Sequence, residues 1–212
     1  TVRRVVAAQP APVTIAVVTT PTLLHMICDY AADGLEFAEI KTRFHAVLAD
    51  PSSVDIHQTA TPPLDTIAVG FATAQLGLGP VRDRMVVFGN AAPRRDRDEV
   101  SSENLGRGLH YARLDNGVEV VSVCSEYAFS FVKDRIVEYR DVASPAAGSQ
   151  FRSRDYFPKY VSAIVDGDYS VLTDELDPAT IEAVPPHLVA WTDGFGNIKT
   201  TLRRSHLAAE GL

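Results

Sequence analysis

Three short segments of the sequence combine residue types that bind ligands or take part in chemistry. Asp29 lies near the end of the apolar run Leu23–Tyr30, and a carboxylate at the carboxyl end of a buried strand can accept hydrogen bonds from ligand hydroxyls. Arg152 and Ser153 are adjacent and could offer positive charge and a hydroxyl group to an anion. The segment Asp193–Asn197 reads Asp-Gly-Phe-Gly-Asn and could present an aromatic ring flanked by hydrogen-bonding side chains.

Each of these segments also has an ordinary structural interpretation. Asp29 could serve only to cap a helix, and Ser153 could cap the helix that follows it. The Gly-Phe-Gly-Asn sequence is also that of a common tight turn. On the sequence alone, both interpretations of each segment stay open.

Hydrophobic patterning predicts the elements that must position these residues. The predicted strands are Leu23–Tyr30, Ser53–His57 and Met85–Phe88, and the predicted helices are Leu35–Leu48, Pro62–Leu76 and Tyr156–Val165. Because strands and helices alternate, we expect an α/β fold with a mostly parallel central sheet and helices on both faces.

Two hairpins are also expected. Tyr111–Leu114 and Val118–Val123 flank Asp115-Asn116-Gly117, and Asn-Gly favours a type I′ turn. Leu188–Thr192 and Ile198–Leu202 flank the Gly-Phe-Gly-Asn segment in a second hairpin-like arrangement.

The chain divides into three expected parts. Residues 1–20, rich in Pro, Ala and Thr, form an N-terminal arm, residues 21–180 form the α/β domain, and residues 181–212 begin a truncated β-rich C-terminal segment. The charged stretch Pro93–Arg107 is expected to be a surface loop.

Composition excludes several classes of function. The net charge is −7 and basic residues alternate with acidic ones, as in Arg94–Glu99, so nucleic-acid binding is disfavoured. Cys28 and Cys124 lie in apolar runs without nearby ligands, which indicates buried thiols, and the six histidines form no metal-binding pattern. No apolar run has the length of a membrane span, so we expect a cytoplasmic protein without a membrane partner.

Five places along the chain, in the correct order, resemble motifs of the S-adenosylmethionine hydroxide adenosyltransferase and halogenase family. They are Cys28–Ala31 with Lys41 twelve residues after Asp29, Val54–His57 with Pro63–Asp65, Asp115–Gly117, Phe151–Asp155, and Asp193–Asn197. The chain is similar to the family over most of residues 28–200.

The resemblance implies an activity and a set of binding residues. Members of this family cleave the C5′–S bond of S-adenosylmethionine, deliver hydroxide or halide to C5′ and release methionine, in sites between neighbouring subunits of a trimer. Asp29 would bind the ribose, Phe195 and Asn197 the adenine, and Asp193 the methionine ammonium group. S-adenosylmethionine would be the small-molecule substrate, and no further cofactor is implied.

The sequence departs from the hydrolytic members of the family at the residues that activate water. Those members use an Asp, an Arg and a His, whereas the corresponding loop Val87–Arg95 has no carboxylate, and only Arg95 or its neighbour Arg94 could keep the arginine's role. Arg152 stands at the histidine position and cannot serve there as a general base. Ser153 matches a position where halogenating relatives carry Ser or Gly.

Three hypotheses follow from this pattern. The first is an enzyme that performs substitution at C5′, with Arg95, Arg152 and Ser153 lining the nucleophile pocket. The second is a trimeric binding or scaffold protein that keeps an adenosine pocket without chemistry. The third is an enzyme with a rebuilt pocket for another substrate, since fold does not fix function. Most of the family's second domain is not present in the sequence, so we expect either that this domain is vestigial or that the sequence is a fragment of a longer chain.

Overall fold

The computed structural model describes residues 20–80, 84–91, 108–145, 148–149 and 151–209. The expected loop Pro93–Arg107 and all but the last residue of the expected arm 1–20 lie outside these ranges.

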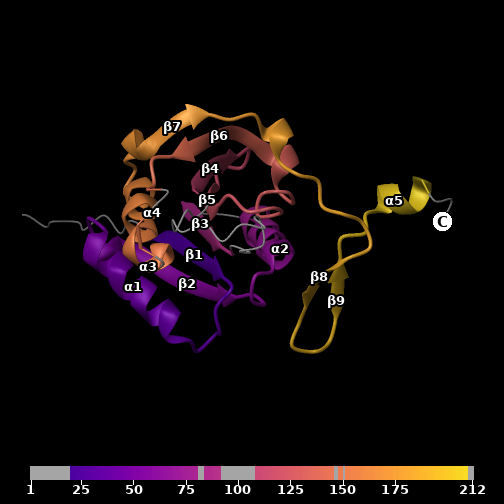
Figure 1. The fold of residues 1–212 in the computed structure, drawn as a ribbon, viewed down its shortest axis with the longest axis horizontal. Helices are drawn as coiled ribbons and strands as arrows, with labels where there is room; N and C mark the ends of the chain where they lie inside the picture. The colour runs from indigo at the N-terminus through magenta and orange to yellow at the C-terminus, as the bar shows by residue number, and fades with distance from the viewer. Residues whose placement is uncertain (1–19, 81–83, 92–107, 146–147, 150, 210–212) are drawn as a thin grey trace, which may run out of the picture.

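A seven-stranded mixed sheet forms the centre of the molecule (Figure 1). Its strands are β1 (Thr22–Cys28), β2 (Val54–Ala60), β3 (Met85–Asn90), β4 (Leu109–Leu114), β5 (Glu119–Val123), β6 (Ile136–Val142) and β7 (Leu172–Glu175). They lie in the order β2-β1-β3-β5-β4-β6-β7. The pairs from β2 to β5 are parallel, and the pairs that add β4, β6 and β7 are antiparallel.

Helices cover both faces of this sheet, which confirms the expected α/β class. α1 (Leu35–Val47) and α4 (Phe157–Val165) pack on one face, and α2 (Thr66–Gly77) packs on the other. Short helices complete the chain: α3 (Arg152–Asp155), α5 (Arg204–Ala209), and the 3₁₀ turns η1 (Pro51–Ser53), η2 (Lys133–Arg135), η3 (Tyr169–Val171) and η4 (Pro178–Thr180).

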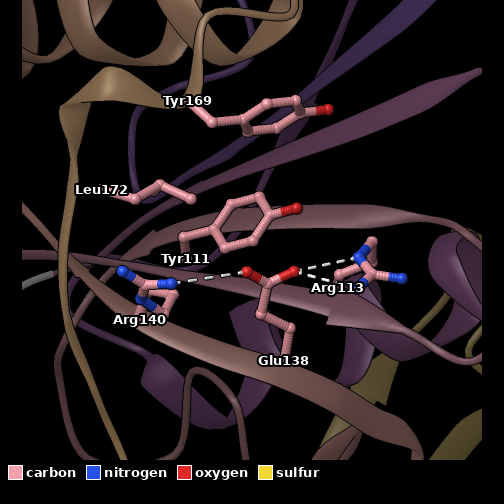
Figure 2. Close-up of a pocket in the computed structure, with 6 residues that line it drawn as sticks. All are labelled: Tyr111, Arg113, Glu138, Arg140, Tyr169 and Leu172. Atoms are coloured by element: carbon pink, nitrogen blue, oxygen red, sulfur yellow. Dashed lines mark hydrogen bonds and ion pairs between the residues drawn. The ribbon is translucent and has the colours of Figure 1, made fainter.

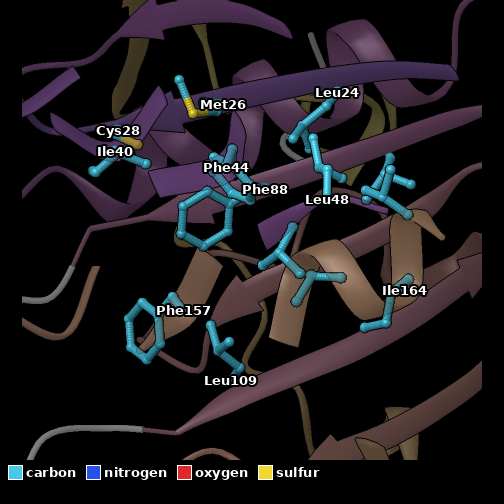
Figure 3. Close-up of a cluster of buried hydrophobic side chains, with 14 of the residues drawn as sticks. Leu24, Met26, Cys28, Ile40, Phe44, Leu48, Phe88, Leu109, Phe157 and Ile164 are labelled. Carbon is cyan, nitrogen blue, oxygen red and sulfur yellow. The ribbon is translucent and has the colours of Figure 1, made fainter. Parts of the chain in front are cut away.

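Two hydrophobic clusters hold these layers together, one on each face of the sheet. Met26 and Phe88 point toward α1 and α4, where Phe88 meets Phe44 and Phe157 edge to face (Figure 3). The next residue of β1, Ile27, belongs to the cluster beneath α2. Successive strand residues alternate between the faces, so a strand buried on both faces is apolar throughout, as the sequence pattern indicated.

The hairpin between β4 and β5 forms as expected, but its turn type differs from the prediction. In the turn only Gly117 has a positive φ, of +86°, and its N–H donates to Leu114 O at 2.9 Å. A type I′ turn needs positive φ at both central residues, so the type I′ expectation is wrong. The geometry is that of a type I turn followed by a left-handed glycine.

Two strands have no counterpart among the predicted elements. β6 carries Glu138, Arg140 and Asp141 among its seven residues, and β7 has only four residues. Both strands lie on the antiparallel side of the sheet, where one face can meet water and the apolar signal is diluted. The sheet is therefore parallel over its first four strands only.

A second sheet of two strands, β8 (Val189–Thr192) and β9 (Ile198–Thr200), lies within the expected C-terminal segment. Trp191 stacks on Phe71 of α2, with ring centroids 6.4 Å apart, and thereby attaches the hairpin to the body. The turn between the strands extends away from the sheet (Figure 1). Within the described ranges, no helix combines the length and apolarity needed to span a bilayer.

Candidate functional site

The carboxyl ends of β1 and β3 bring together residues that are far apart in the sequence. Cys28 and Asn90 are paired at the ends of these parallel strands, and the N–H of Asp29 donates to Asn90 O at 3.1 Å. The side chains that follow β1 and end β3 therefore emerge at one edge of the sheet, where ligands of open α/β sheets bind. We call this the carboxyl edge.

Ser153 joins this edge through a chain of side-chain hydrogen bonds. The Tyr30 hydroxyl donates to Ser153 Oγ at 2.6 Å and accepts from Asn90 Nδ2 at 2.8 Å. α3 and α4 begin after Phe151 and Tyr156 without any side-chain cap. Ser153 therefore caps neither helix and instead accepts a hydrogen bond from Tyr30.

Asp29, the residue before Tyr30, is half-buried and accepts a hydrogen bond from a backbone segment with strained geometry. Its Oδ2 accepts from the N–H of Leu64 at 3.1 Å, and Leu64 has a φ of +63°, which is costly for a residue with a Cβ. α2 is capped by Asp65, so Asp29 is not a helix cap. Burial raises the pKa of Asp29, and the hydrogen bond from Leu64 opposes that rise.

Arg152 is directed into the framework. It is buried, its guanidinium donates to Pro145 O at 2.5 Å, and it lies 5.1 Å from the centroid of the Phe157 ring. Burial lowers the pKa of this guanidinium. The expectation that Arg152 lines a nucleophile pocket stays a prediction, and Arg95, its expected neighbour there, lies outside the described residues.

The Asp193–Asn197 segment forms a turn organised by its own carboxylate. Asp193 Oδ1 accepts the N–H groups of Phe195 and Asn197, each at 2.9 Å, and Oδ2 accepts Asn197 Nδ2 at 2.7 Å. These bonds lower the pKa of Asp193. Gly196 has a φ of +84°, and the ring of Phe195 is 94% exposed. We call this segment the hairpin tip.

One copy of the chain does not bring the hairpin tip and the carboxyl edge together. The hairpin packs on α2, whereas α3, which carries Ser153, packs with α1 and α4 on the opposite side (Figure 1). Asp29 and Ser153 thus lie at the same edge of the sheet, where Tyr30 bonds to Ser153, while Asp193, Phe195 and Asn197 form a separate group.

Sequence reasoning did not identify Tyr30 and Asn90 as site residues. The available signal was their position, since each lies at the carboxyl end of a predicted strand and the carboxyl ends of parallel strands meet. The sequence could not tell that both side chains would turn toward Ser153.

A hollow of about 340 Å³ lies near the amino end of β5, away from the carboxyl edge. Its lining residues are Tyr111, Arg113, Glu138, Arg140, Tyr169 and Leu172 (Figure 2). Glu138 lies between Arg113 at 3.0 Å and Arg140 at 3.8 Å, and Arg140 also donates to Thr173 O. The charged groups satisfy one another, so this hollow offers less to a ligand than the carboxyl edge does.

Beneath this hollow, a buried carboxylate is fully engaged. Glu119 is 3% exposed and accepts from Arg84 at 2.7 Å, from Tyr169 at 2.8 Å and from Tyr111 at 3.0 Å. Arg84 also donates to the carbonyl of Ile164 at the end of α4, at 2.6 Å. This group, which we call the Glu119 network, ties α4 to the sheet.

Comparison with known proteins defines the fold and no more. No protein-family model matches the sequence, and no curated protein matches it. An uncharacterized conserved protein from Thermotoga maritima is similar in structure, with a TM-score of 0.64, 15% identity, and coverage of 88% of this chain and 74% of its own. A conserved hypothetical protein from Thermus thermophilus has a TM-score of 0.56, 18% identity, and coverage of 87% of this chain and 73% of its own.

Proposed function

We propose that this chain binds S-adenosylmethionine and replaces its methionine with a small nucleophile, as the family it resembles does. The observation that carries the proposal is the hydrogen bond at the carboxyl edge between Ser153 and Tyr30, the residue next to Asp29. Tyr30, the neighbour of Asp29, bonds to Ser153 across 123 positions of sequence. Asp29 and Ser153 are the carboxylate and the hydroxyl that the resemblance assigns to the ribose and to the nucleophile.

The proposed reaction requires no covalent bond between the protein and its substrate. The nucleophile donates an electron pair to C5′, the C5′–S bond breaks, and its electrons return to sulfur, which leaves as the neutral thioether of methionine. A sulfonium is already a good leaving group, so the site must align and desolvate the nucleophile opposite sulfur. Half-buried Asp29 can accept hydrogen bonds from both ribose hydroxyls, because a carboxylate has more acceptor positions than the Leu64 N–H uses.

The adenine-binding part of the proposed site comes from a second copy of the chain. Phe195 is 94% exposed at the hairpin tip, and the carboxyl edge exposes Leu64 and Phe151, which are 51% and 60% exposed. A head-to-tail contact that places the tip of one copy on the edge of the next closes into a ring when the rotation allows it. A homotrimer with three shared sites is the assembly that the resemblance implies.

Turnover is the direct test of this proposal. The purified chain is incubated with S-adenosylmethionine and with fluoride, chloride, bromide or no halide, and methionine and adenosine products are measured. Ser153→Ala is expected to lower the rate, whereas Ser170→Ala, an exposed serine of η3 near the other end of the strands, should leave it unchanged. If S-adenosylmethionine binds but neither adenosine nor a 5′-substituted adenosine forms, the proposed activity is wrong.

A complementation experiment tests the shared site independently of turnover. Asp29→Asn and Phe195→Ala each remove one half of the proposed pocket, so neither variant alone should bind adenosine well in calorimetry. Co-expressed chains form mixed rings in which an intact edge meets an intact tip, and part of the binding should return. If the mixture binds no better than the separate variants, the site is not shared between subunits.

A binding protein without chemistry is the second candidate function, and the position of Arg152 favours it. Its guanidinium contacts Pro145 O and the Phe157 ring, which commits it to the framework. In that case adenosine and S-adenosylmethionine would both bind in calorimetry, and no product would appear after long incubation.

A further inference from the structure

At the carboxyl edge, the side chains of Asn90, Tyr30 and Ser153 are linked by hydrogen bonds in which each donates to the next, and Asn90 is the first donor. The side-chain nitrogen of an asparagine can only donate, and Asn90 Nδ2 lies 2.8 Å from the Tyr30 oxygen. Asn90 is 7% exposed, so its donor is turned toward Tyr30 and away from water.

The Tyr30 hydroxyl in turn donates its proton to a hydrogen bond with Ser153. A phenol has one proton to donate, and because its oxygen already accepts from Asn90, the proton points to Ser153 Oγ at 2.6 Å. Burial raises the pKa of Tyr30 well above its usual range. The phenol therefore keeps its proton throughout the neutral and mildly alkaline range.

Ser153 is left with a proton of its own to donate. Its oxygen accepts from Tyr30, so the Ser153 hydroxyl hydrogen must point to a different partner. Ser153 is half-buried, and no acceptor for this proton is recorded among the parts of the chain that the structure describes. The Ser153 hydroxyl, the last group in this series of hydrogen bonds, is thus a free donor at the carboxyl edge within the described residues.

We infer that Asn90 and Tyr30 are positioning residues that fix Ser153 as the donor to a small anion, a halide in the reaction proposed above. The inference rests on that proposed function for the identity of the anion. A halide only needs donors and a dry contact, whereas water also needs a base to take its proton. The members of this chain of bonds, Asn90, Tyr30 and Ser153, include no base.

Because the Asn90 amide nitrogen can only donate to Tyr30, it determines which group donates in each of these hydrogen bonds. A single isosteric substitution at residue 90 should therefore exchange donors and acceptors. In Asn90→Asp the carboxylate accepts from Tyr30, Tyr30 then accepts from Ser153, and the Ser153 proton is turned inward. The anion would meet a lone pair of Ser153 and the added negative charge of residue 90. Tyr30→Phe breaks the same chain without adding charge and with little change in volume.

Binding of chloride, observed without turnover, is the first readout. The ³⁵Cl line width of NaCl is measured with the full chain in the presence of adenosine. We expect excess broadening with the native chain and an affinity lower by about tenfold or more in Asn90→Asp, Tyr30→Phe and Ser153→Ala, as for loss of a hydrogen bond to a charged group. Tyr160→Phe, a half-buried tyrosine of α4, and Ser170→Ala are the matched controls.

Kinetics supplies a second readout that separates this inference from the proposed function. With turnover, Asn90→Asp and Tyr30→Phe should raise KM for halide by about tenfold and leave KM for S-adenosylmethionine unchanged. Variant-dependent chloride binding without turnover supports the anion site and refutes the reaction. No broadening with the native chain, or equal halide affinity in the native chain and both variants, overturns the inference.

Discussion

Two buried polar groups lie at opposite ends of the strands and differ in how completely they are satisfied. In the Glu119 network, the carboxylate receives bonds from Arg84, Tyr111 and Tyr169, so both of its oxygens are engaged. At the carboxyl edge, the bonds run in one direction and end at the half-buried Ser153. A closed network contributes to the fold, whereas an open chain of donors keeps a hydrogen bond for a ligand.

The largest expected effect is on the closed network. Arg84→Met removes the cation that faces a carboxylate with a side chain only 4% exposed, and an uncompensated buried charge costs about 3–5 kcal/mol. We expect the free energy of unfolding in urea to fall by about 3 kcal/mol, because the two tyrosines still donate to Glu119.

Arg113→Met is the matched control for this comparison. Arg113 pairs with Glu138 at 3.0 Å, but both side chains are at least 30% exposed, and such surface pairs contribute about 0–1 kcal/mol. If both variants lose equal stability, the Glu119 network contributes no more to the free energy of unfolding than an exposed ion pair does.

The next largest effect is expected at the hairpin tip, on ligand affinity and not on stability. Phe195 is 94% exposed, so Phe195→Ala should change the unfolding free energy by less than about 0.5 kcal/mol. Stacking of a base on an aromatic side chain contributes about 1–3 kcal/mol, and adenosine affinity should fall by about thirtyfold. Calorimetry and urea unfolding of the same variant check both halves; a large stability loss with unchanged affinity would assign the ring to the fold.

A smaller effect with a characteristic pH dependence is expected at Asp29. Burial raises its pKa above the ordinary value of 3.8, and in the proposed site it is the ionised form that accepts from ribose. Adenosine affinity should therefore be full at neutral pH and be lost as the pH falls through this raised pKa. Asp29→Asn should reduce the affinity by about tenfold at pH 7 and remove this pH dependence; a native profile with no loss above about pH 4 would contradict the assignment.

The raised pKa of Asp29 affects the stability of the fold and the affinity for adenosine in opposite ways as the pH changes. A carboxyl group whose folded-state pKa is raised binds its proton more tightly in the folded chain than in the unfolded chain. The contribution of Asp29 to stability is therefore present at low pH and is lost as the pH rises through its folded-state pKa. Comparing unfolding of the native chain with Asp29→Asn across about pH 3–7 isolates this contribution.

The smallest expected effect is a gain in stability at Leu64. Its φ of +63° is costly for leucine and free for glycine, and its side chain is 51% exposed. Leu64→Gly should raise the unfolding free energy by up to about 1 kcal/mol. A lower unfolding free energy instead would mean that packing of the leucine side chain stabilises the fold by more than the backbone strain destabilises it.

The sequence predicts the first half of this fold much better than the second. Continuous apolar runs mark strands such as β1 that are buried on both faces, and the helical spacing of Phe37, Ile40 and Phe44 marks α1. β6 was not predicted because its charged residues dilute the apolar signal, and the antiparallel order follows from pairings between distant segments. The type I′ prediction was wrong because the dipeptide Asn-Gly also fits a type I turn followed by a left-handed glycine.

In the candidate site, too, features that depend on neighbouring residues could be predicted, and those that depend on packing between distant segments could not. The turn at Asp193 depends on neighbours within four positions, so the sequence already allowed a tight turn there. The meeting of Ser153 with Tyr30 depends on the packing of α3 across the sheet edge, which no local pattern encodes. The burial of Arg152 against Phe157 likewise depends on the packing of α4.

The two outermost strands of the sheet limit how copies of this chain can associate. β2 exposes Asp55 and His57, which form a pair 3.0 Å apart, and β7 is short and carries Asp174 and Glu175. Charged side chains on an edge strand, as on β2, and a short edge strand, as in β7, both resist pairing with the strands of another molecule. Growth of the sheet from one copy into the next is therefore disfavoured at these two edges.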